Sequence, residues 1–187
     1  MMLFATNINE NMNIFKTLNI DEKMNSFTAL SIDEISTIEA TRKRRIDKLI
    51  VHCSAVGPHQ TSSAAQIDAW HRAKGWQMIG YHYVIRRDGS IEIGRLADMI
   101  GAHTSGQNAN SLGICYEGGL VEVKELKSER VKELQAADSR TPEQKATLLA
   151  LLRHLKTLYP NATIHGHNEF ARKACPCFDA HTEYSQL

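Results

Sequence analysis

The spacing of apolar and polar residues changes near residue 45 of the chain. Beyond this point, short apolar runs rich in β-branched residues predict buried strands, and they alternate with amphipathic helical stretches. The predicted strands lie in DKLIVHCSA, in the two halves of GYHYVIRRDGSIEIGRL, in SLGICYEGGL and in NATIHGHNEF; the predicted helices lie in SSAAQIDAWHRAKGW and TPEQKATLLALLRHLKTLYP. Because no strict βαβ repeat is present, we predict a single α/β domain with a central mixed β-sheet flanked by α-helices.

Turn and capping signals mark the ends of these elements. Asp88-Gly89 separates two strand-like halves, which is the commonest short signal for a hairpin. The first helix follows a Ser cap and ends at Gly75, whereas the second opens with a capping box from Thr141 to Gln144. The side of the second helix that faces the core is predicted by a stripe of leucines: Leu148, Leu151, Leu152 and Leu155.

Two regions do not fit this pattern. Residues 1–45 are rich in Asn, Ile, Ser, Thr and Glu, contain no Gly or Pro, and end in the basic run TRKRR. We interpret them as an N-terminal extension of unknown role before a domain at 46–187, with helical character in SIDEISTIEA. The basic run is interpreted as a solvated linker, with a contact to an anionic polymer as the alternative. The charged stretch from Val121 to Arg140 is interpreted as a solvated surface excursion with a helical turn.

Size and composition exclude several classes of protein. A chain of 187 residues is long enough for one buried core, and a net charge of +1 provides no field that would attract nucleic acid. No run of about 18 apolar residues is present, so no membrane span is predicted. The first residues, MMLFATNINE, lack the basic and apolar regions of a Sec signal peptide, so we expect cytoplasmic synthesis. We also expect a monomer.

The stretch HGHNEFARKACPCFDA is the densest chemical feature, and it suggests a metal site, a nucleophilic cysteine or a disulfide cluster. Disulfides are disfavoured, since Cys175 and Cys177 are too close in sequence to bridge without strain. Zinc prefers imidazole nitrogen and thiolate sulfur, and a catalytic zinc has three protein ligands and one open position. His167 and Cys175 can approach each other through the loop between them. His52, at the end of a predicted buried strand, is the best third ligand.

The alternative to each assignment is a structural role. A histidine at a strand end is often a satisfied core residue, and a buried cysteine is often inert packing. We predict packing roles for Cys53 and Cys115, which lie on apolar strands.

Four blocks, VHCSA, GYHYVIRRDGSIEIGR, GAHTSGQNANSLGICYEGG and HNEFARKACPCFD, occur in an order and spacing that resemble the zinc N-acetylmuramoyl-L-alanine amidases of the type 2 family. The similarity is to the phage lysozyme branch, which is related to peptidoglycan recognition proteins, and it covers about residues 46–180. The resemblance implies Zn²⁺ as cofactor, with His52, His167 and Cys175 as its ligands. It places His165 and Cys177 outside the ligand set.

The resemblance also implies catalytic roles for Tyr81 and Lys173. A phenol and an ammonium group aimed at the carbonyl oxygen would stabilise the charge that develops there during attack by zinc-bound water. The general base stays open, because similar enzymes differ over whether a Glu or the Tyr at the position of Tyr81 handles the proton. Glu169 either accepts a hydrogen bond from a metal ligand and so orients it, or caps the following turn. His103 is predicted to contact the substrate.

His71 and His82 are predicted to be structural. Neighbouring residues of a strand point to opposite faces, so His82 should face away from the metal if Tyr81 faces it.

The implied function is zinc-dependent hydrolysis of the amide bond between N-acetylmuramic acid and L-alanine in peptidoglycan. One alternative is a non-catalytic peptidoglycan-recognition module. Another is a structural zinc site, which needs a fourth ligand such as Cys177 or His165. A phage endolysin, a bacterial recycling enzyme and a secreted effector would each lack a signal peptide, so reaching the cell wall would require a holin or a dedicated secretion system.

Overall fold

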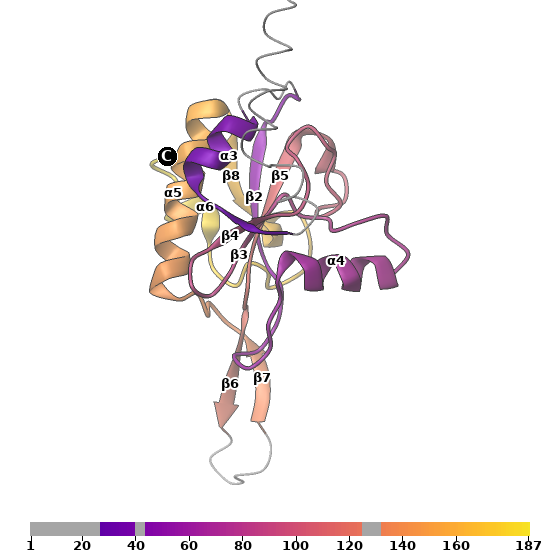
Figure 1. Cartoon of the computed structure of the whole chain (residues 1–187). Helices are drawn as coiled ribbons and strands as arrows, with labels where there is room; N and C mark the ends of the chain where they lie inside the picture. The colour runs from indigo at the N-terminus through magenta and orange to yellow at the C-terminus, as the bar shows by residue number, and fades with distance from the viewer. Residues whose placement is uncertain (1–26, 40–43, 125–131) are drawn as a thin grey trace, which may run out of the picture.

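The structure is a computed structural model, and it describes residues 27–39, 44–124 and 132–187 (Figure 1). Within these residues, six strands form one sheet in the order β1-β4-β3-β5-β2-β8. Their bounds are β1 Ala29–Leu30, β4 Ile91–Ile93, β3 Tyr83–Ile85, β5 Ser111–Tyr116, β2 Lys48–Cys53 and β8 Thr163–Gly166. Strands β3, β5, β2 and β8 are parallel, whereas β4 and β1 are antiparallel additions at one edge. The predicted mixed sheet is confirmed.

Helices cover both faces of this sheet. On one side lie α3 (Ile32–Glu39), α5 (Pro142–Leu158) and α6 (Ala180–Glu183), and on the other lies α4 (Ala64–Ala73) (Figure 1). Side chains of the strands alternate between two hydrophobic clusters, as the period of a strand requires. The larger cluster includes Val51 and Cys53, so His52, which lies between them, points to the face covered by α4.

The predicted helix signals are confirmed. The Ser63 hydroxyl caps α4 by accepting the Gln66 N–H at 3.1 Å, and Thr141 caps α5 in the same way through Gln144 N–H at 3.1 Å. The leucine stripe of α5 is fully buried. The hairpin predicted around Asp88-Gly89 is also confirmed, with β3 and β4 paired in antiparallel register.

The charged stretch after β5 is a surface excursion, as predicted, but its described part is a β-hairpin rather than a helical turn. Strands β6 (Leu120–Lys124) and β7 (Lys132–Ala136) pair antiparallel and project away from the main sheet (Figure 1). Leu-Val-Glu-Val-Lys and Lys-Glu-Leu-Gln-Ala alternate apolar and polar side chains, which is a strand period. The high charge of the segment obscured this alternation.

Part of the N-terminal extension belongs to the folded core. Strand β1 pairs with β4, and α3 packs beside α5, as predicted for the helical stretch SIDEISTIEA. The side chains of Ile35 and Ile38 on α3 are fully buried in the larger cluster. Burial of two isoleucines contributes roughly 3–6 kcal/mol of hydrophobic stabilisation, which explains why this segment adheres to the domain.

Arg44 corrects the interpretation of the basic run as a solvated linker. Its guanidinium donates to the carbonyl oxygens of Ala97 at 2.7 Å, Ala109 at 2.8 Å and Ser111 at 2.9 Å. Arg45 is exposed, and the start of the run lies outside the described residues. Arg44 therefore fastens the extension to the loop before β5.

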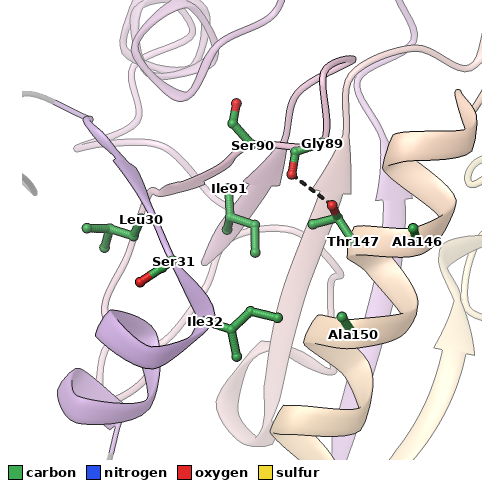
Figure 2. Close-up of a pocket in the computed structure, with 9 residues that line it drawn as sticks. All are labelled: Leu30, Ser31, Ile32, Gly89, Ser90, Ile91, Ala146, Thr147 and Ala150. Carbon is green, nitrogen blue, oxygen red and sulfur yellow. Dashed lines mark hydrogen bonds between the residues drawn. The ribbon is translucent and has the colours of Figure 1, made fainter.

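Where the extension meets the domain, the surface contains a hollow of about 380 Å³ between β1, the β3–β4 turn and α5 (Figure 2). Thr147 donates its hydroxyl to the Gly89 carbonyl at 2.9 Å across one wall. The lining residues are Leu30, Ser31, Ile32, Gly89, Ser90, Ile91, Ala146, Thr147 and Ala150. Since none of them is titratable, this hollow offers no groups for acid–base or metal chemistry.

In the part of the chain that the structure describes, no helix combines the length and the apolar character needed to cross a bilayer.

Candidate metal centre

The three predicted ligands converge at the carboxyl ends of the parallel strands. One donor atom each from His52, His167 and Cys175 lies within 4.8 Å of the others. The imidazole rings of His52 and His167 are 4.5 Å apart between centroids, and Cys175 Sγ is 3.8 Å from His52 Nδ1. The structure therefore brings together the three residues that the sequence singled out.

The register of the sheet explains the pairing of the two histidines. Strands β2 and β8 are parallel neighbours in which Val51 lies opposite Gly166. The next residue in each segment is a histidine, so His52, still within β2, and His167, just after β8, lie side by side. His167 begins the short 3₁₀ turn η2 (His167–Glu169), which directs the chain back toward the site.

Cys175 reaches the centre from the loop that follows this turn. The backbone N–H of Cys53 donates to Cys175 Sγ at 3.2 Å, and this contact holds the sulfur beside the end of β2.

The surroundings keep both imidazoles neutral. Burial lowers the pKa of His52 well below the ordinary 6.5, and the nearby His103 and His167 add to this effect. The pKa of His167 is also lowered, first by burial and then by Lys173. Neutral imidazoles and a thiolate are the ligands that zinc prefers, so the donor set fits a zinc ion.

The other ring nitrogen of His52 is within hydrogen-bond distance of a third histidine. His52 Nε2 lies 3.0 Å from His103 Nδ1, so if Nδ1 of His52 faces the metal, its Nε2–H donates to His103. His103 Nε2 in turn lies 3.3 Å from the Ser111 hydroxyl, which donates to the Gln107 carbonyl at 2.8 Å. Burial lowers the pKa of His103 to about 2, so the ring is a neutral acceptor. This relay fixes the tautomer of His52.

The close packing of His103 depends on a glycine. A Cβ on Gly113 would lie 2.5 Å from the His103 ring, so no larger residue fits at this position of β5 without moving the ring. His103 is only 8% exposed and is turned toward His52, although it also lines a surface hollow.

Two hollows meet at the centre. The first, of about 270 Å³, is lined by Tyr81, Lys173, His167 and Cys175 together with α4 side chains such as Trp70. The second, of about 470 Å³, shares His167 and Lys173 and continues along the segment around His103. The shared residues make the two hollows parts of one cleft around the candidate metal ligands.

Two further predicted residues line this cleft: Tyr81, from the segment before β3, and Lys173, from the segment after η2. The Tyr81 ring is 5.1 Å from that of His52, and burial raises the pKa of its phenol well above the ordinary value, so the group keeps its proton. Lys173 is exposed and belongs to the loop between His167 and Cys175. Both side chains are thus hydrogen-bond donors beside the centre.

Glu169 contacts the turn rather than a candidate metal ligand. Its Oε1 accepts the backbone N–H of Gly166 at 2.6 Å, and its Oε2 lies 2.7 Å from His165 Nδ1. Of the two roles predicted for Glu169, these contacts correspond to capping of the turn. The carboxylate fixes the path of the chain immediately around His167.

His71, His82 and the three cysteines outside the candidate ligand set have contacts within the fold. His82 is fully buried, accepts the Gly113 N–H at 2.9 Å, and has a pKa lowered to about 3 mainly by burial. His71 accepts the Gly80 N–H at 2.9 Å. These contacts are consistent with the predicted structural roles, and His71 also lines the first hollow. Cys53 and Cys115 are buried as predicted, whereas Cys177 Sγ donates to the Gly119 carbonyl at 3.2 Å and lies 3.7 Å from Cys53 Sγ.

One cleft residue was not identified from the sequence. The Trp76 side chain is 41% exposed, lines the larger hollow and packs against His71 with 4.4 Å between ring centroids. An exposed aromatic ring beside a cleft is a common platform for a ligand. The sequence signal that could have identified Trp76 is its position directly after Gly75, which ends the helix. An apolar residue there does not belong to the buried face of the helix.

The fold and the donor set together define an α/β enzyme domain with a candidate metal centre of the zinc-hydrolase type. The chain belongs to the N-acetylmuramoyl-L-alanine amidase family, whose model matches residues 42–178. The predicted family and enzyme class are confirmed.

Individual relatives agree with this assignment. The chain is 36% identical to the endolysin of Enterobacteria phage K11 over 145 residues, which cover 78% of this chain and 89% of that protein. It is 35% identical to the endolysin of Escherichia phage T7 over the same shares of the two chains. Among solved structures, an endolysin N-acetylmuramoyl-L-alanine amidase from Clostridium intestinale matches with a TM-score of 0.55 and 30% identity, covering 72% of this chain and 77% of that one.

The likeness extends to animal proteins at the level of the fold. Drosophila PGRP-LB matches with a TM-score of 0.58 and 24% identity over 78% of this chain and 83% of that one.

Proposed function

We propose that this protein hydrolyses the amide bond between the lactyl group of N-acetylmuramic acid and L-alanine in peptidoglycan, with zinc bound by His52, His167 and Cys175. The observation that carries the proposal is the convergence of these three donors within 4.8 Å in a cleft that Tyr81 and Lys173 also line. A zinc ion held there would supply Lewis-acid chemistry, polarising the scissile carbonyl and lowering the pKa of a water molecule.

The contacts of the neighbouring residues favour a catalytic site over a structural one. A structural zinc site needs a fourth protein ligand. Cys177 directs its thiol to the Gly119 carbonyl, and His165 is paired with Glu169 and with Thr163. With both residues engaged elsewhere, the fourth side of the centre faces the cleft, where substrate and water have access.

Tyr81 and Lys173 act as donors to the carbonyl oxygen. This oxygen gains negative charge as the tetrahedral intermediate forms, so hydrogen bonds to it are stronger in the transition state than in the ground state. The protonated phenol of Tyr81, on leaving its hydrogen bond with Cys115, and the ammonium group of Lys173 supply such bonds within the cleft. Loss of one donor of this type typically reduces kcat by roughly 10² to 10³.

The rest of the cleft suits a glycopeptide. Trp76 offers an apolar face, while Ser105 and Asn108 add polar groups along the larger hollow. His103 lines the same hollow, so it can contact substrate while it supports His52. The similarity to phage endolysins supports a bacteriolytic role, in which the protein is made in the cytoplasm and reaches the cell wall through a holin or a dedicated secretion system.

The test is a cleavage assay on purified peptidoglycan with the full chain, in which new L-alanine amino termini are quantified. We expect activity that disappears with a chelator and returns with Zn²⁺. A protein that binds muropeptide and zinc but releases no amino termini would be a recognition module, and the proposal would be wrong.

A further inference from the structure

A second cluster of side chains that could hold a metal ion lies outside the candidate centre. One nitrogen from each of His165 and His181 and one carboxylate oxygen of Glu169 lie within 4.8 Å of one another. The three residues come from β8, η2 and α6, so segments with different roles in the fold meet here. None of them is a member of the His52, His167 and Cys175 set.

We infer that His165, Glu169 and His181 form a second binding site for a divalent transition-metal cation such as Zn²⁺ or Ni²⁺. Two imidazoles and a carboxylate are a donor set that these borderline ions accept, whereas Ca²⁺ prefers oxygen ligands alone. The ion would take one atom from each side chain and replace one of the two contacts of His165, with Glu169 or with Thr163, and solvent would complete its coordination.

The orientation of the rings prepares the site. His165 and His181 are stacked with 5.5 Å between centroids and 18° between planes, and Phe170 packs its ring at 5.2 Å against His165. His181 Nδ1 lies 3.1 Å from the Ile164 carbonyl, which can only accept, so Nδ1 carries the hydrogen. Nε2 of His181 is then the nitrogen with a lone pair for the metal.

Glu169 links His165 to the backbone. Its Oε1 accepts the Gly166 N–H, while its Oε2 lies 2.7 Å from His165 Nδ1. A carboxylate that is already fixed by a backbone amide loses little conformational freedom when it binds an ion. The same carboxylate is thus positioned either to ligate the ion or to orient His165.

Binding would require small movements of the side chains. Bonds of about 2.1 Å at tetrahedral angles place the ligand atoms of a zinc site about 3.4 Å apart, whereas His165 Nδ1 and Glu169 Oε2 lie 2.7 Å apart. The Glu169 side chain is 35% exposed and His181 is exposed. Side-chain rotations that shift their ligand atoms by about an ångström therefore meet little packing resistance. His165, whose side chain is only 17% exposed, serves as the fixed point.

Occupancy of this site would couple to the candidate active site through η2. Glu169 ends the turn that His167 begins, so an ion held by Glu169 restrains the backbone of a proposed catalytic ligand. It would also tie α6 to β8. A bound ion should therefore raise the midpoint of thermal unfolding of the full chain.

The inference is tested by counting bound Zn²⁺ on the metal-stripped full chain by equilibrium dialysis, with Ca²⁺ as the hard-cation control. We expect two equivalents of Zn²⁺ for the native chain and one for His181→Ala, while Ca²⁺ binds at neither site. His165→Gln should also bind one equivalent, which guards against an effect peculiar to His181. His59→Ala is the matched control, because His59 is an exposed histidine outside both clusters, and it should bind two.

Cys175→Ala separates this inference from the proposed function. It should lose the equivalent bound at the first site and keep the one at the second. If the native chain binds a single equivalent that His181→Ala and His165→Gln retain, or if both variants still bind two, the second site does not exist. If Cys175→Ala binds two while His181→Ala binds one, the second site stands and the proposed zinc centre fails.

Discussion

His103 is the most informative residue for the proposed zinc centre, because two different roles can be assigned to it. The sequence predicts a contact with substrate, whereas the structure shows its Nδ1 3.0 Å from His52 Nε2. We predict that His103→Ala weakens zinc binding, since the imidazole of His52 would lose the partner that fixes its tautomer. His103→Asn should restore most of the affinity, because its side-chain oxygen can accept the His52 N–H.

The expected magnitude follows from two independent considerations. Removing the acceptor leaves the N–H of fully buried His52 without its partner, which costs about 1–3 kcal/mol. Loss of the group that supports a ligating histidine typically reduces metal affinity by about 10 to 100-fold, or about 1.4–2.8 kcal/mol. Thr104 Oγ1 lies 3.4 Å from His52 Nε2 and can replace part of the lost bond. We therefore expect an effect near the lower limit, about tenfold.

The assay is competition for Zn²⁺ between each variant and a chromogenic chelator, with the absorption spectrum of the Co²⁺-substituted protein as a second readout. A supporting role for His103 predicts a raised zinc Kd and an altered Co²⁺ spectrum in His103→Ala, both reversed in His103→Asn. If His103→Ala binds zinc like the native chain and only its KM for muropeptide rises, the supporting role is wrong and the role in substrate binding remains.

Four further predictions concern other parts of the molecule. Cys175→Ala should lose the zinc of the proposed centre and all amidase activity, while Cys177→Ala should keep both, as measured by metal analysis and amino-terminus release. Lys173→Ala should lower kcat by roughly 10² to 10³ with unchanged zinc content; a smaller effect would exclude its role as an oxyanion donor. Ile38→Ala should reduce the free energy of unfolding in urea by about 2–5 kcal/mol, because this fully buried residue anchors α3. Because the pKa of His82 falls from 6.5 to about 3 on folding, His82 alone should cost about 1.4 kcal/mol of stability per pH unit as the pH falls from 6.5 to about 3, and nothing above pH 6.5; His82→Asn should lower the slope by that amount in a pH series of urea unfolding curves.

Short-range signals account for most of what the sequence predicted correctly. The capping box at Thr141, the hairpin turn at Asp88-Gly89 and the buried strand that contains His52 each depend on residues within a few positions of one another. The failure at the β6–β7 hairpin has a related cause. Its strands are stabilised by pairing with each other on an exposed surface, so high charge did not exclude a strand as it would in a core.

The candidate site required information that local patterns do not contain. The approach of His52 to His167 depends on β8 pairing beside β2 with Val51 opposite Gly166, and nothing in either segment alone specifies that partner or that register. Donor chemistry and motif similarity predicted the candidate ligand set, but the relay through His103 and the contact of Glu169 with Gly166 emerged only from the tertiary structure.

The extension before residue 45 and the candidate centre are connected through Arg44, although the sequence separates them. Arg44 donates to the backbone carbonyls of Ala109 and Ser111, which lie at the start of β5. The Ser111 hydroxyl is in turn the partner of His103 Nε2, and His103 supports His52. A guanidinium with several carbonyl partners restrains all of them at once, because its donors lie in one rigid plane. The extension therefore restrains the backbone on which the support of the proposed zinc ligand depends, and its contribution reaches beyond covering the edge of the sheet.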